Sequence, residues 1–520
     1  MALSWDELSP SNRLVNTQSV EPRAYQINIT KSVFTGKNTL VILPTGLGKT
    51  LIAVFAIANA LSNGKKAILL APTKPLSEQH YNSLQKLLNI ESERILLLTG
   101  SMAGSKRAEL ESEAKVISAT PQTIANDLKN ARLSLDEVGV VVFDECHRAS
   151  GRYAYTYIAD ECKLKGVQLV GLTASPGGDK KKIDALISTL AINNIEIRIS
   201  SDLDVEPYVM DKSLHVLYVE KGKLIDSTLA ILKPVIDEHL SNLYKYGLSP
   251  FKNFENMPKG RFLQIGDNIS KLQAQNYKYM AMFNYVYVLN LVHAYDLLST
   301  EGLHPFATYM HTLETREKKS RAVNSILSNK SVVSAIKTVR DAIERGEEHP
   351  KMITIINLLK KELNGKSVII FAQYRSTIKR LEELLNLNGI EARAFVGKKD
   401  GVTQYQQQET IQQFRDNKFR VLVATSIGEE GLDIPSVDAV IFYESIPNEI
   451  RNIQRRGRAG RMKYGEVFIL VALRTKDETY LMISRLREKR MRDLIMKIKS
   501  DMSRHAIQSH APYERGQKTL

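Results

Sequence analysis

Cysteines and long apolar runs are both scarce in this chain of 520 residues, and each shortage excludes a class of protein. Cys146 and Cys162 are its two cysteines, too few for a disulfide framework or for a zinc site built from cysteines. No run of about 18 apolar residues occurs, and residues 1–18 lack the apolar core of a signal peptide. Repeats and low-complexity tracts are missing as well, which excludes solenoids and disordered scaffolds. We therefore expect an intracellular, cytoplasmic protein that neither spans a membrane nor is secreted.

An excess of basic residues is the clearest bias of the composition. The chain has 72 lysines and arginines against 57 acidic residues, a formal net charge of +15. Such a charge favours a polyanionic partner, above all nucleic acid, although a basic surface that serves only solubility is the alternative. The hydrophobic content of 43% and the charged content of 25% are ordinary for a globular protein, and the length suggests about three domains.

Two stretches of the chain have the pattern of parallel α/β domains. Within residues 20–215, short and almost continuous apolar runs alternate with helical patterns, as expected for strands that are buried on both faces. These runs cover residues 39–43, 66–71, 94–100, 115–120, 138–145 and 167–175. Residues 366–473 repeat the pattern. The residues between, from about 222 to 346, are helical in pattern and rich in Leu, Tyr, Lys and Asn.

The sequence therefore predicts an α/β fold of two tandem, doubly wound parallel-sheet domains with an all-helical domain inserted between them. We expect domain 1 at residues 1–215, the helical insert at 216–346, domain 2 at 347–475 and a basic helical tail at 476–520. This tail could dock back on the two sheet domains, or it could extend a track for nucleic acid.

The segment LPTGLGKT, which begins at Leu43, has the residues of a phosphate-binding loop. Leu43 stands where the generic pattern has its first glycine, but Gly46 and Gly48 allow the tight turn that directs backbone N–H groups at phosphate. Lys49 would bridge the β- and γ-phosphates of ATP, and the hydroxyl of Thr50 would bind Mg²⁺. A glycine turn that follows a buried strand by chance is the alternative.

Asp144 and Glu145 end an apolar run, so both carboxylates should lie at the carboxyl edge of a buried strand, where open α/β sheets bind ligands. We assign Asp144 to the magnesium ion and Glu145 to the general base that deprotonates the attacking water. A solvated acidic turn is the alternative. His147 and Cys146 are adjacent to the pair, but two neighbouring ligands without partners are weak evidence for zinc.

The densest arginine cluster extends from Arg455 to Arg461, with two glycines between the arginines. The cluster could be a plain patch that binds nucleic acid. Its spacing favours a second role, because the glycines let two guanidinium groups project from a tight helix start towards one anion. We expect Arg458 and Arg461 to stabilise the γ-phosphate during transfer, as arginine fingers do.

Short motifs in a fixed order extend through both α/β domains. They are PTGLGKT (44–50), PTKPL (72–76), TPQT (120–123), DECH (144–147), TAS (173–175), VIIFAQYR (368–375), ATSIGEEGLDIP (424–435) and QRRGRAGR (454–461). This set resembles that of the superfamily 2 DExH-box helicases, whose two motor domains are RecA-like. The helical insert and the DECH form resemble the archaeal Hef, Fanconi anaemia M, RIG-I-like and Dicer helicases, and the archaeal Hef helicase region most of all.

The resemblance implies roles for residues at matching positions of the nucleotide site. ATP would be bound by Arg23, Gln26, Thr45, Gly46, Leu47, Gly48, Lys49, Thr50, Gly431 and Asp433. In this group Gln26 would contact adenine, and Gly431 and Asp433 would help to link the bound strand to the nucleotide. Gln454 would lie near the γ-phosphate beside the two arginines. Thr173 and Ser175 would couple hydrolysis to closure of the two domains.

The resemblance also implies contacts to the nucleic-acid backbone. They fall on Pro72, Thr73, Lys74, Thr99, Gly100, Thr120, Pro121, Gln122, Gln373, Arg375, Thr425 and Ser426. Each of these stretches follows a buried strand, so hydroxyl, amide and backbone N–H groups can line one cleft and hold phosphates without reading bases. Two tandem domains that approach each other when ATP binds between them would form a stepping motor.

The helical insert leaves two questions open. Its aromatic residues could stack on bases, although mixed helical spacings are more typical of core packing; they are Tyr277, Tyr279, Phe283, Tyr285, Tyr287 and Tyr295. The basic residues within 315–321 could face a duplex or could form a solvated helix face. The resemblance to Hef favours contact between this domain and branched DNA.

Together these features predict a monomeric, Mg²⁺-dependent ATPase that translocates on nucleic acid and unwinds or remodels forked or branched DNA in replication-fork repair, alongside repair or replication proteins. The alternative enzyme is a helicase or translocase that acts on RNA duplexes. A nucleic-acid-binding module without ATPase activity is disfavoured because the lysine, the acidic pair and both arginines are present. Full-length Hef proteins continue into a nuclease module, which nothing in this chain matches.

Overall fold

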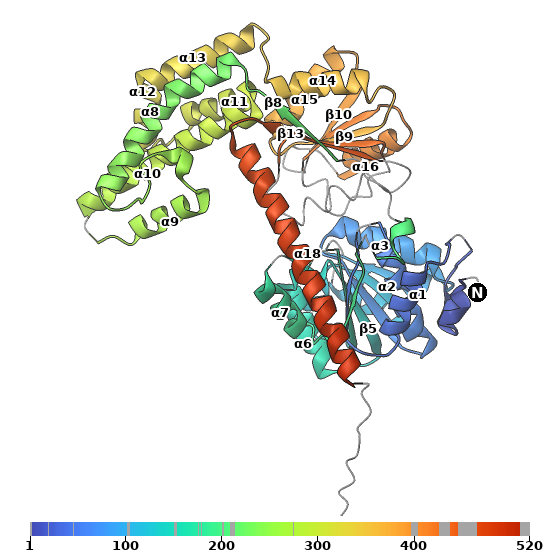
Figure 1. Ribbon diagram of the computed structural model, residues 1–520. Coiled ribbons are helices and arrows are strands. Elements are labelled where there is room, and N and C mark those ends of the chain that lie inside the picture. Colours follow the sequence, from blue (N-terminus) through green and yellow to red (C-terminus); the bar gives the residue numbers. More distant parts are fainter. Residues whose placement is uncertain are drawn as a thin grey trace, which may run out of the picture.

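The structure is a computed structural model that describes residues 3–18, 20–44, 46–100, 104–149, 153–174, 176–177, 179–199, 202–208, 214–273, 275–396, 404–425, 437–445 and 465–509. These residues form two sheet domains, a helical domain and a long C-terminal helix that runs between them (Figure 1). Among the described residues, no helix is long and apolar enough to cross a membrane.

Domain 1 is a seven-stranded parallel sheet with helices on both faces. Its strand order is β3-β4-β2-β5-β6-β1-β7. The strands are β1 (Thr39–Ile42), β2 (Lys66–Leu70), β3 (Ile95–Leu98), β4 (Val116–Ala119), β5 (Val138–Asp144), β6 (Gln168–Thr173) and β7 (Asn194–Ile197). The helices are α1 (Ala24–Val33), α2 (Lys49–Ser62), α3 (Lys74–Leu87), α4 (Gly104–Glu113), α5 (Pro121–Lys129), α6 (Ala154–Leu164) and α7 (Lys180–Thr189).

The alternation of side chains along β1 divides the core of domain 1 into two layers. Val41 belongs to the cluster that buries α1, α2 and α3, whereas Leu40 and Ile42 belong to the cluster that buries α5, α6 and α7. This is the two-residue period of a strand that is covered on both faces. It explains why these runs are apolar throughout, and it confirms the prediction of a doubly wound sheet.

Domain 2 is a six-stranded parallel sheet with the order β10-β11-β9-β12-β13-β8. The strands are β8 (Leu214–Val219), β9 (Val368–Phe371), β10 (Ala392–Phe395), β11 (Val421–Ala424), β12 (Ala439–Phe442) and β13 (Glu466–Ala472). The helices are α14 (Pro350–Lys361), α15 (Arg375–Leu387) and α16 (Gln404–Arg415).

Strand β8 lies in a different domain from the one expected. It precedes the helical domain in sequence but pairs with β13, in a register that joins Leu214 to Val467 and Val219 to Ala472. The expected boundary between residues 215 and 216 therefore cuts through a strand of the second sheet. Because α14 follows the helical domain, the chain both enters and leaves that domain from domain 2.

The helical domain packs its helices around one core. They are α8 (Lys223–Lys245), α9 (Lys259–Ser270), α10 (Gln275–Asp296), a π-helix (Leu297–Glu301), α11 (Leu303–Thr315), α12 (Arg321–Ser328) and α13 (Lys330–Glu344). The core explains most of the aromatic residues of α10. Tyr285 and Tyr287 are buried, and Phe283 and Tyr295 pack against the same cluster. Tyr279, by contrast, is 52% exposed.

A buried polar cluster fastens the π-helix to domain 2. The hydroxyl of Tyr443 donates to the backbone oxygen of Glu301 at 2.9 Å, and the hydroxyl of Thr377 donates to its carboxylate at 3.1 Å. Lys351 donates to the backbone oxygen of Thr300 at 3.0 Å and pairs with Asp477. Nε2 of His349 also lies 3.3 Å from the backbone oxygen of Ser299. The π-helix is therefore held against domain 2 beside the junction at which the chain leaves the helical domain.

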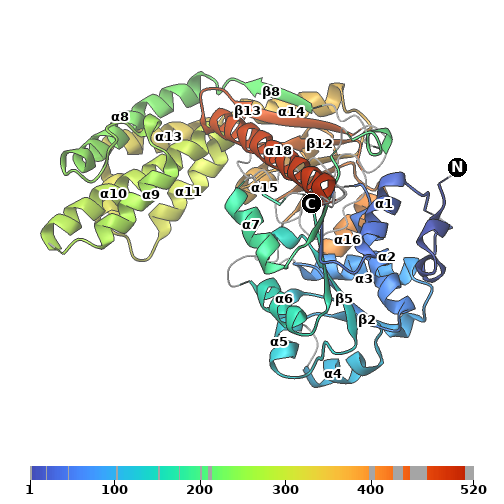
Figure 2. The same ribbon diagram turned by 60° about the horizontal axis from the view of Figure 1, so that its bottom comes forward.

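The C-terminal helix α18 (Lys476–Ser509) starts beside β13 and extends to domain 1 (Figures 1 and 2). Met491 is 6% exposed and belongs to the buried cluster that contains Ile158 of α6 and Leu186 of α7. Of the two roles that the sequence left open for the tail, docking on the sheet domains therefore applies to this part of it.

Candidate functional site

The loops singled out from the sequence meet along one edge of the domain 1 sheet. β1, β6 and β5 are neighbours in the strand order, and the phosphate loop, the TAS motif and the acidic pair follow their carboxyl ends. PTKPL follows β2 on the other side of β5. The backbone N–H of Leu43 donates to the oxygen of Thr173 at 3.1 Å, which ties the phosphate loop to the end of β6. Ligands of parallel α/β sheets bind at this edge.

The phosphate loop turns through two glycines in the left-handed region. Gly46 has a φ of 85° and Gly48 a φ of 80°, which other residues rarely adopt. α2 begins directly afterwards at Lys49, so the N–H groups of its first turn face the loop. Leu43 is fully buried in the core, which explains why an apolar residue replaces the generic glycine. Lys49 donates to the backbone oxygen of Leu43 at 3.0 Å. Thr45 lies outside the described residues.

Residues of α1 hold the phosphate loop from the side where adenine is expected. Gln26 donates to the backbone oxygen of Leu47 at 3.1 Å, and the hydroxyl of Tyr25 donates to the same oxygen at 3.0 Å. Arg23 donates to the hydroxyl of Tyr25 at 3.1 Å and lies 4.8 Å from the ring centre of Tyr208. The side-chain oxygen of Gln26 is buried and has no hydrogen-bond partner among the described residues. A buried acceptor of this kind fits the exocyclic amine of adenine.

Asp144 ends β5 and is 7% exposed. Its Oδ2 lies 2.8 Å from Nε2 of His80, and the hydroxyl of Tyr155 donates to its backbone oxygen at 2.7 Å. Burial would raise the pKa of Asp144, but the hydrogen bond from His80 and the charges of His80 and Lys49 outweigh burial and hold this pKa below its ordinary value. The carboxylate is therefore ionised near neutral pH, as a ligand of Mg²⁺ must be.

Glu145 follows in the left-handed region with a φ of 49°, which separates its side chain from that of Asp144. Its carboxylate lies 3.3 Å from Nδ1 of His147, and the same nitrogen lies 3.2 Å from the hydroxyl of Thr173. The acidic pair and the TAS motif are therefore in contact through His147. Cys146 is fully buried, and burial raises the pKa of its thiol well above the ordinary value. A protonated, enclosed thiol is a poor metal ligand.

The predicted nucleic-acid contacts of domain 1 also lie at carboxyl ends of strands. Thr73 precedes α3, which has a proline in its first turn, and Thr120 precedes α5, which starts at Pro121. The hydroxyl of Ser118 on β4 donates to the backbone oxygen of Ser77 on α3 at 2.8 Å, which joins the strand that leads into TPQT to the helix that begins within PTKPL. Pro72, Thr99 and Gly100 lie in loops at the same edge, and Lys74 and Gln122 lie in the first turns of α3 and α5.

In domain 2, Gln373 is exposed beyond β9, and Arg375 begins α15. Thr425 follows β11, and its side-chain oxygen is buried without a hydrogen-bond partner among the described residues. β9 and β11 are neighbours, so these residues share the carboxyl edge of the second sheet. The described residues do not include Ser175, Ser426, Gly431, Asp433, Gln454, Arg458 and Arg461.

His80, Tyr25 and Tyr208 belong to the site but were not predicted. His80 reaches Asp144 because β2, which leads into α3, lies beside β5. Strand order cannot be read from the apolar runs alone, so no feature of the sequence indicates this contact. Tyr25 adjoins Gln26 in sequence, whereas Tyr208 is distant from it and is brought close only by the fold.

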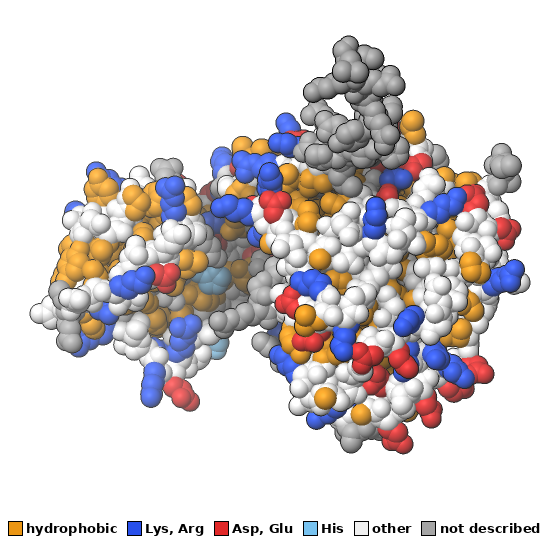
Figure 3. All heavy atoms as spheres, turned by 90° about the horizontal axis from the view of Figure 1, so that it is seen from below, with side chains coloured by type: hydrophobic (Ala, Val, Ile, Leu, Met, Phe, Trp, Pro, Cys, Tyr) orange, Lys and Arg blue, Asp and Glu red, His pale blue; other side chains and the backbone are white. Residues whose placement is uncertain are grey.

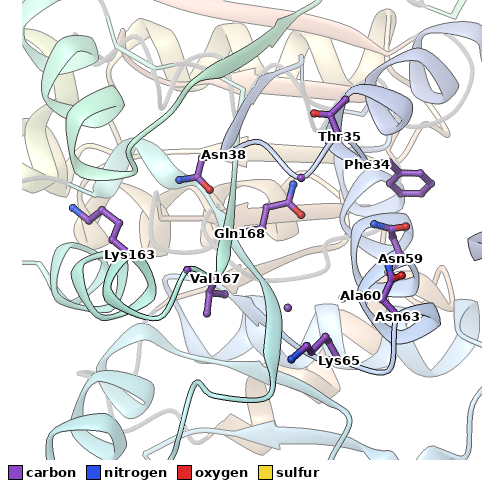
Figure 4. A pocket seen from close by; sticks show the side chains of 13 residues that line it. Phe34, Thr35, Asn38, Asn59, Ala60, Asn63, Lys65, Lys163, Val167 and Gln168 are labelled. Carbon is purple, nitrogen blue, oxygen red and sulfur yellow. The ribbon is translucent and has the colours of Figure 1, made fainter.

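A polar pocket of about 510 Å³ lies at the opposite, amino edge of the domain 1 sheet (Figure 4). It is lined by Asn38, which precedes β1, and by Gln168, the first residue of β6. Asn59, Asn63 and Lys65 also line it. Because these residues are at the starts of the strands, the pocket is separate from the phosphate loop and is not the nucleotide site.

Three family models match successive parts of the chain. A DEAD/DEAH box helicase model matches residues 23–183, and a helicase conserved C-terminal domain model matches residues 350–463. A helical bundle, described provisionally as that of an ATP-dependent RNA helicase, matches residues 226–346. The matched ranges follow domain 1, domain 2 and the helical domain.

The chain is similar to a solved structure and to curated proteins along most of its length. The Hef helicase domain of Pyrococcus furiosus is 39% identical, with a TM-score of 0.72 over 91% of this chain and 100% of that one. A Methanocaldococcus jannaschii protein, provisionally named an ATP-dependent RNA helicase, is 36% identical over 93% of this chain and 62% of its own length. The ATP-dependent DNA helicase fml1 of Schizosaccharomyces pombe is 30% identical over 90% of this chain and 59% of its own length.

The chain thus spans about three fifths of the length of these two curated relatives, and all of the Hef helicase domain. The order of the matched family models agrees with the order of the domains, and the Hef helicase domain is 39% identical to this chain. The chain belongs to the superfamily 2 helicases of the Hef and Fanconi anaemia M group and carries the ATPase domains of that family.

Proposed function

We propose that this chain is an ATP-driven motor that translocates on DNA and unwinds or remodels forked or branched structures during repair of stalled replication. It would act as a monomer together with repair or replication proteins. The observation that carries the proposal is the shared edge of the domain 1 sheet. There the phosphate loop and the acidic pair are hydrogen-bonded to the end of β6, and α3, which begins within PTKPL, is hydrogen-bonded to Asp144 and to β4.

The nucleotide half of this edge can bind and orient ATP. Backbone N–H groups at the start of α2 and the ammonium of Lys49 would hold the phosphates, and Gln26 would accept a hydrogen bond from adenine. Thr50 and Asp144 would hold Mg²⁺, which neutralises charge on the phosphates when it is bound. Glu145 would take the proton of the attacking water.

The second half of the catalytic site would come from domain 2. Gln454, Arg458 and Arg461 lie outside the described residues, so their placement rests on the motif alone. Arginines that meet the γ-phosphate only when the domains close would make hydrolysis depend on closure. Thr173, through His147, and Ser175 would transmit that closure to Glu145.

DNA is favoured over RNA as the substrate by the relatives that share all three domains. The S. pombe relative is named a DNA helicase, although the M. jannaschii relative is provisionally named an RNA helicase. The exposed face of the helical domain carries apolar and basic side chains next to each other (Figure 3). For example, Arg321 lies 5.3 Å from the ring centre of Tyr279. A surface that combines basic and aromatic side chains suits a nucleic-acid junction, because it can bind phosphates and stack on unpaired bases.

Steady-state ATPase assays at one fixed salt concentration test the proposal. The panel compares single-stranded DNA, duplex DNA, a fork, a four-way junction and duplex RNA, because backbone binding depends strongly on salt. We expect the fork or the junction to stimulate hydrolysis most, and the Lys49→Ala variant to hydrolyse no ATP on any substrate. Stimulation by duplex RNA alone would overturn the DNA assignment, and turnover by Lys49→Ala at the wild-type rate would overturn the motor.

A further inference from the structure

His80 joins the helix that follows PTKPL to the carboxylate that would hold magnesium. It lies on α3, is 5% exposed, and its Nε2 is 2.8 Å from Oδ2 of Asp144. An ionised carboxylate can only accept hydrogen bonds, so Nε2 of His80 is the donor. Its Nδ1 is buried and has no hydrogen-bond partner among the described residues. Among the described residues, the hydrogen bond to Asp144 is therefore the one that the imidazole of His80 makes.

The other end of α3 belongs to the proposed nucleic-acid surface. Thr73 and Lys74 stand at its start, and the hydroxyl of Ser77 donates to the backbone oxygen of Thr73 at 3.1 Å. Ser77 in turn accepts a hydrogen bond from Ser118, at 2.8 Å, on the strand that leads into TPQT. His80 is six residues beyond Lys74 on the same helix, a rise of about 9 Å. A shift of either loop would move α3, and α3 would carry the imidazole with it.

We propose that His80 is a positioning residue that makes the orientation of the Asp144 carboxylate depend on nucleic-acid binding at the start of α3. This inference rests on the proposed function and names a route by which that function is regulated. The hydrogen bond occupies Oδ2 and so fixes the rotation of the carboxylate relative to the phosphate loop. Partners that orient a metal ligand in this way typically affect metal affinity or activity by about 10- to 100-fold.

Three variants separate the hydrogen bond from the volume of the ring. His80→Phe fills the space but cannot donate, whereas His80→Gln places an amide N–H near the position of Nε2. Ser83→Ala, one turn further along α3, is the matched control because the hydroxyl of Ser83 donates within the helix, to the oxygen of Gln79 at 2.9 Å. Thermal melts of each variant establish that it is folded.

ATPase kinetics with and without single-stranded DNA give the first readout. We expect His80→Phe to lower the DNA-stimulated kcat by about tenfold or more, with smaller changes in the unstimulated kcat and in the KM for ATP. His80→Gln should recover most of the stimulation, and Ser83→Ala should match the wild type. An unchanged stimulated kcat in His80→Phe, or an equal fall in both kcat values, would overturn the inference.

Binding without hydrolysis gives the second readout. The affinity for a fluorescent oligonucleotide is measured with and without Mg²⁺ and a non-hydrolysable ATP analogue, since coupling between two ligands is reciprocal. The analogue should change the affinity of the wild type and of Ser83→Ala, and should change that of His80→Phe much less. An equal change in His80→Phe would overturn the inference. If DNA stimulates no ATPase activity in the wild type, the proposed function itself fails instead.

Discussion

At the scale of single residues, Gln26 has hydrogen-bonding surroundings that indicate its role directly. Its amide nitrogen holds the phosphate loop at Leu47, while its amide oxygen is buried without a partner among the described residues. Leaving such an acceptor unsatisfied costs roughly 1–3 kcal/mol, a cost that a bound adenine would remove. Guanine presents an acceptor where adenine has its amine, so the same oxygen should discriminate between the two bases.

The change Gln26→Ala should therefore raise the KM for ATP by about tenfold and should reduce the preference for ATP over GTP, because one hydrogen bond and its selectivity are lost. Tyr25 still holds the oxygen of Leu47, so the loop should remain folded. Competition kinetics with both nucleotides measure the ratio. Asn28→Ala, at an exposed position of the same helix, is the control. An ATP-to-GTP ratio equal to that of the wild type would argue against adenine at this position.

At the scale of elements, the π-helix that ends at Glu301 determines how the helical domain is attached. Glu301 is 2% exposed, and burial raises its pKa to about 7. The charge of Asp477 also raises this pKa, whereas the charge of Lys351 and the hydrogen bonds from Thr377 and Thr300 lower it. The folded protein thus binds this proton more tightly than the unfolded chain does. The stabilisation from that proton is complete below the pKa of an unfolded glutamate, about 4.3, and is lost as the pH rises through 7.

Glu301→Gln keeps the shape of the side chain but does not titrate. We expect the variant to gain stability relative to the wild type as the pH rises from 5 to 8, by up to about 3 kcal/mol in the free energy of unfolding. Urea unfolding at several pH values measures the difference. Glu317→Gln, on an exposed turn, should show no such trend. A pH-independent difference for Glu301→Gln would mean that Glu301 is already ionised across this range.

The strands also show which parts of the fold could be predicted from the sequence and which could not. The strands of both sheets that are buried on both faces were found because runs such as Val138–Asp144 are apolar at nearly every position. β8 was missed as a strand of domain 2 because it is an edge strand whose residues are mostly exposed or half-buried, and its partner lies some 250 residues later. Motif spacing located Lys49 and Asp144, but only the strand order brings His80 to Asp144.

At the scale of the whole molecule, α18 connects the two motor domains. Its first turn contains Asp477, which is paired with Lys351 in domain 2, and it places Met491 in the core of domain 1. We expect Met491→Ala to destabilise the docking of α18 by roughly 2 kcal/mol, since large-to-small changes of buried methionine cost about that much or more. Met482→Ala is the matched control, because Met482 lies on the same helix but is 64% exposed.

Limited proteolysis measures this docking, since cleavage of a helix follows its local opening. The Met491→Ala variant should be cut within α18 faster than the wild type and faster than Met482→Ala. Equal cleavage rates for the two variants would contradict a specific role of Met491.

The attachment of the helical domain to domain 2 also limits how it could be exchanged between relatives. A Cβ on Gly222 would lie 3.6 Å from the ring of Pro350, so the two junctions of the domain are adjacent and a transplant could in principle be cut there. The graft would nonetheless carry Glu301 into a foreign setting, away from Lys351 and Thr377. A working chimaera therefore needs the recipient residues of that cluster to be exchanged along with the graft.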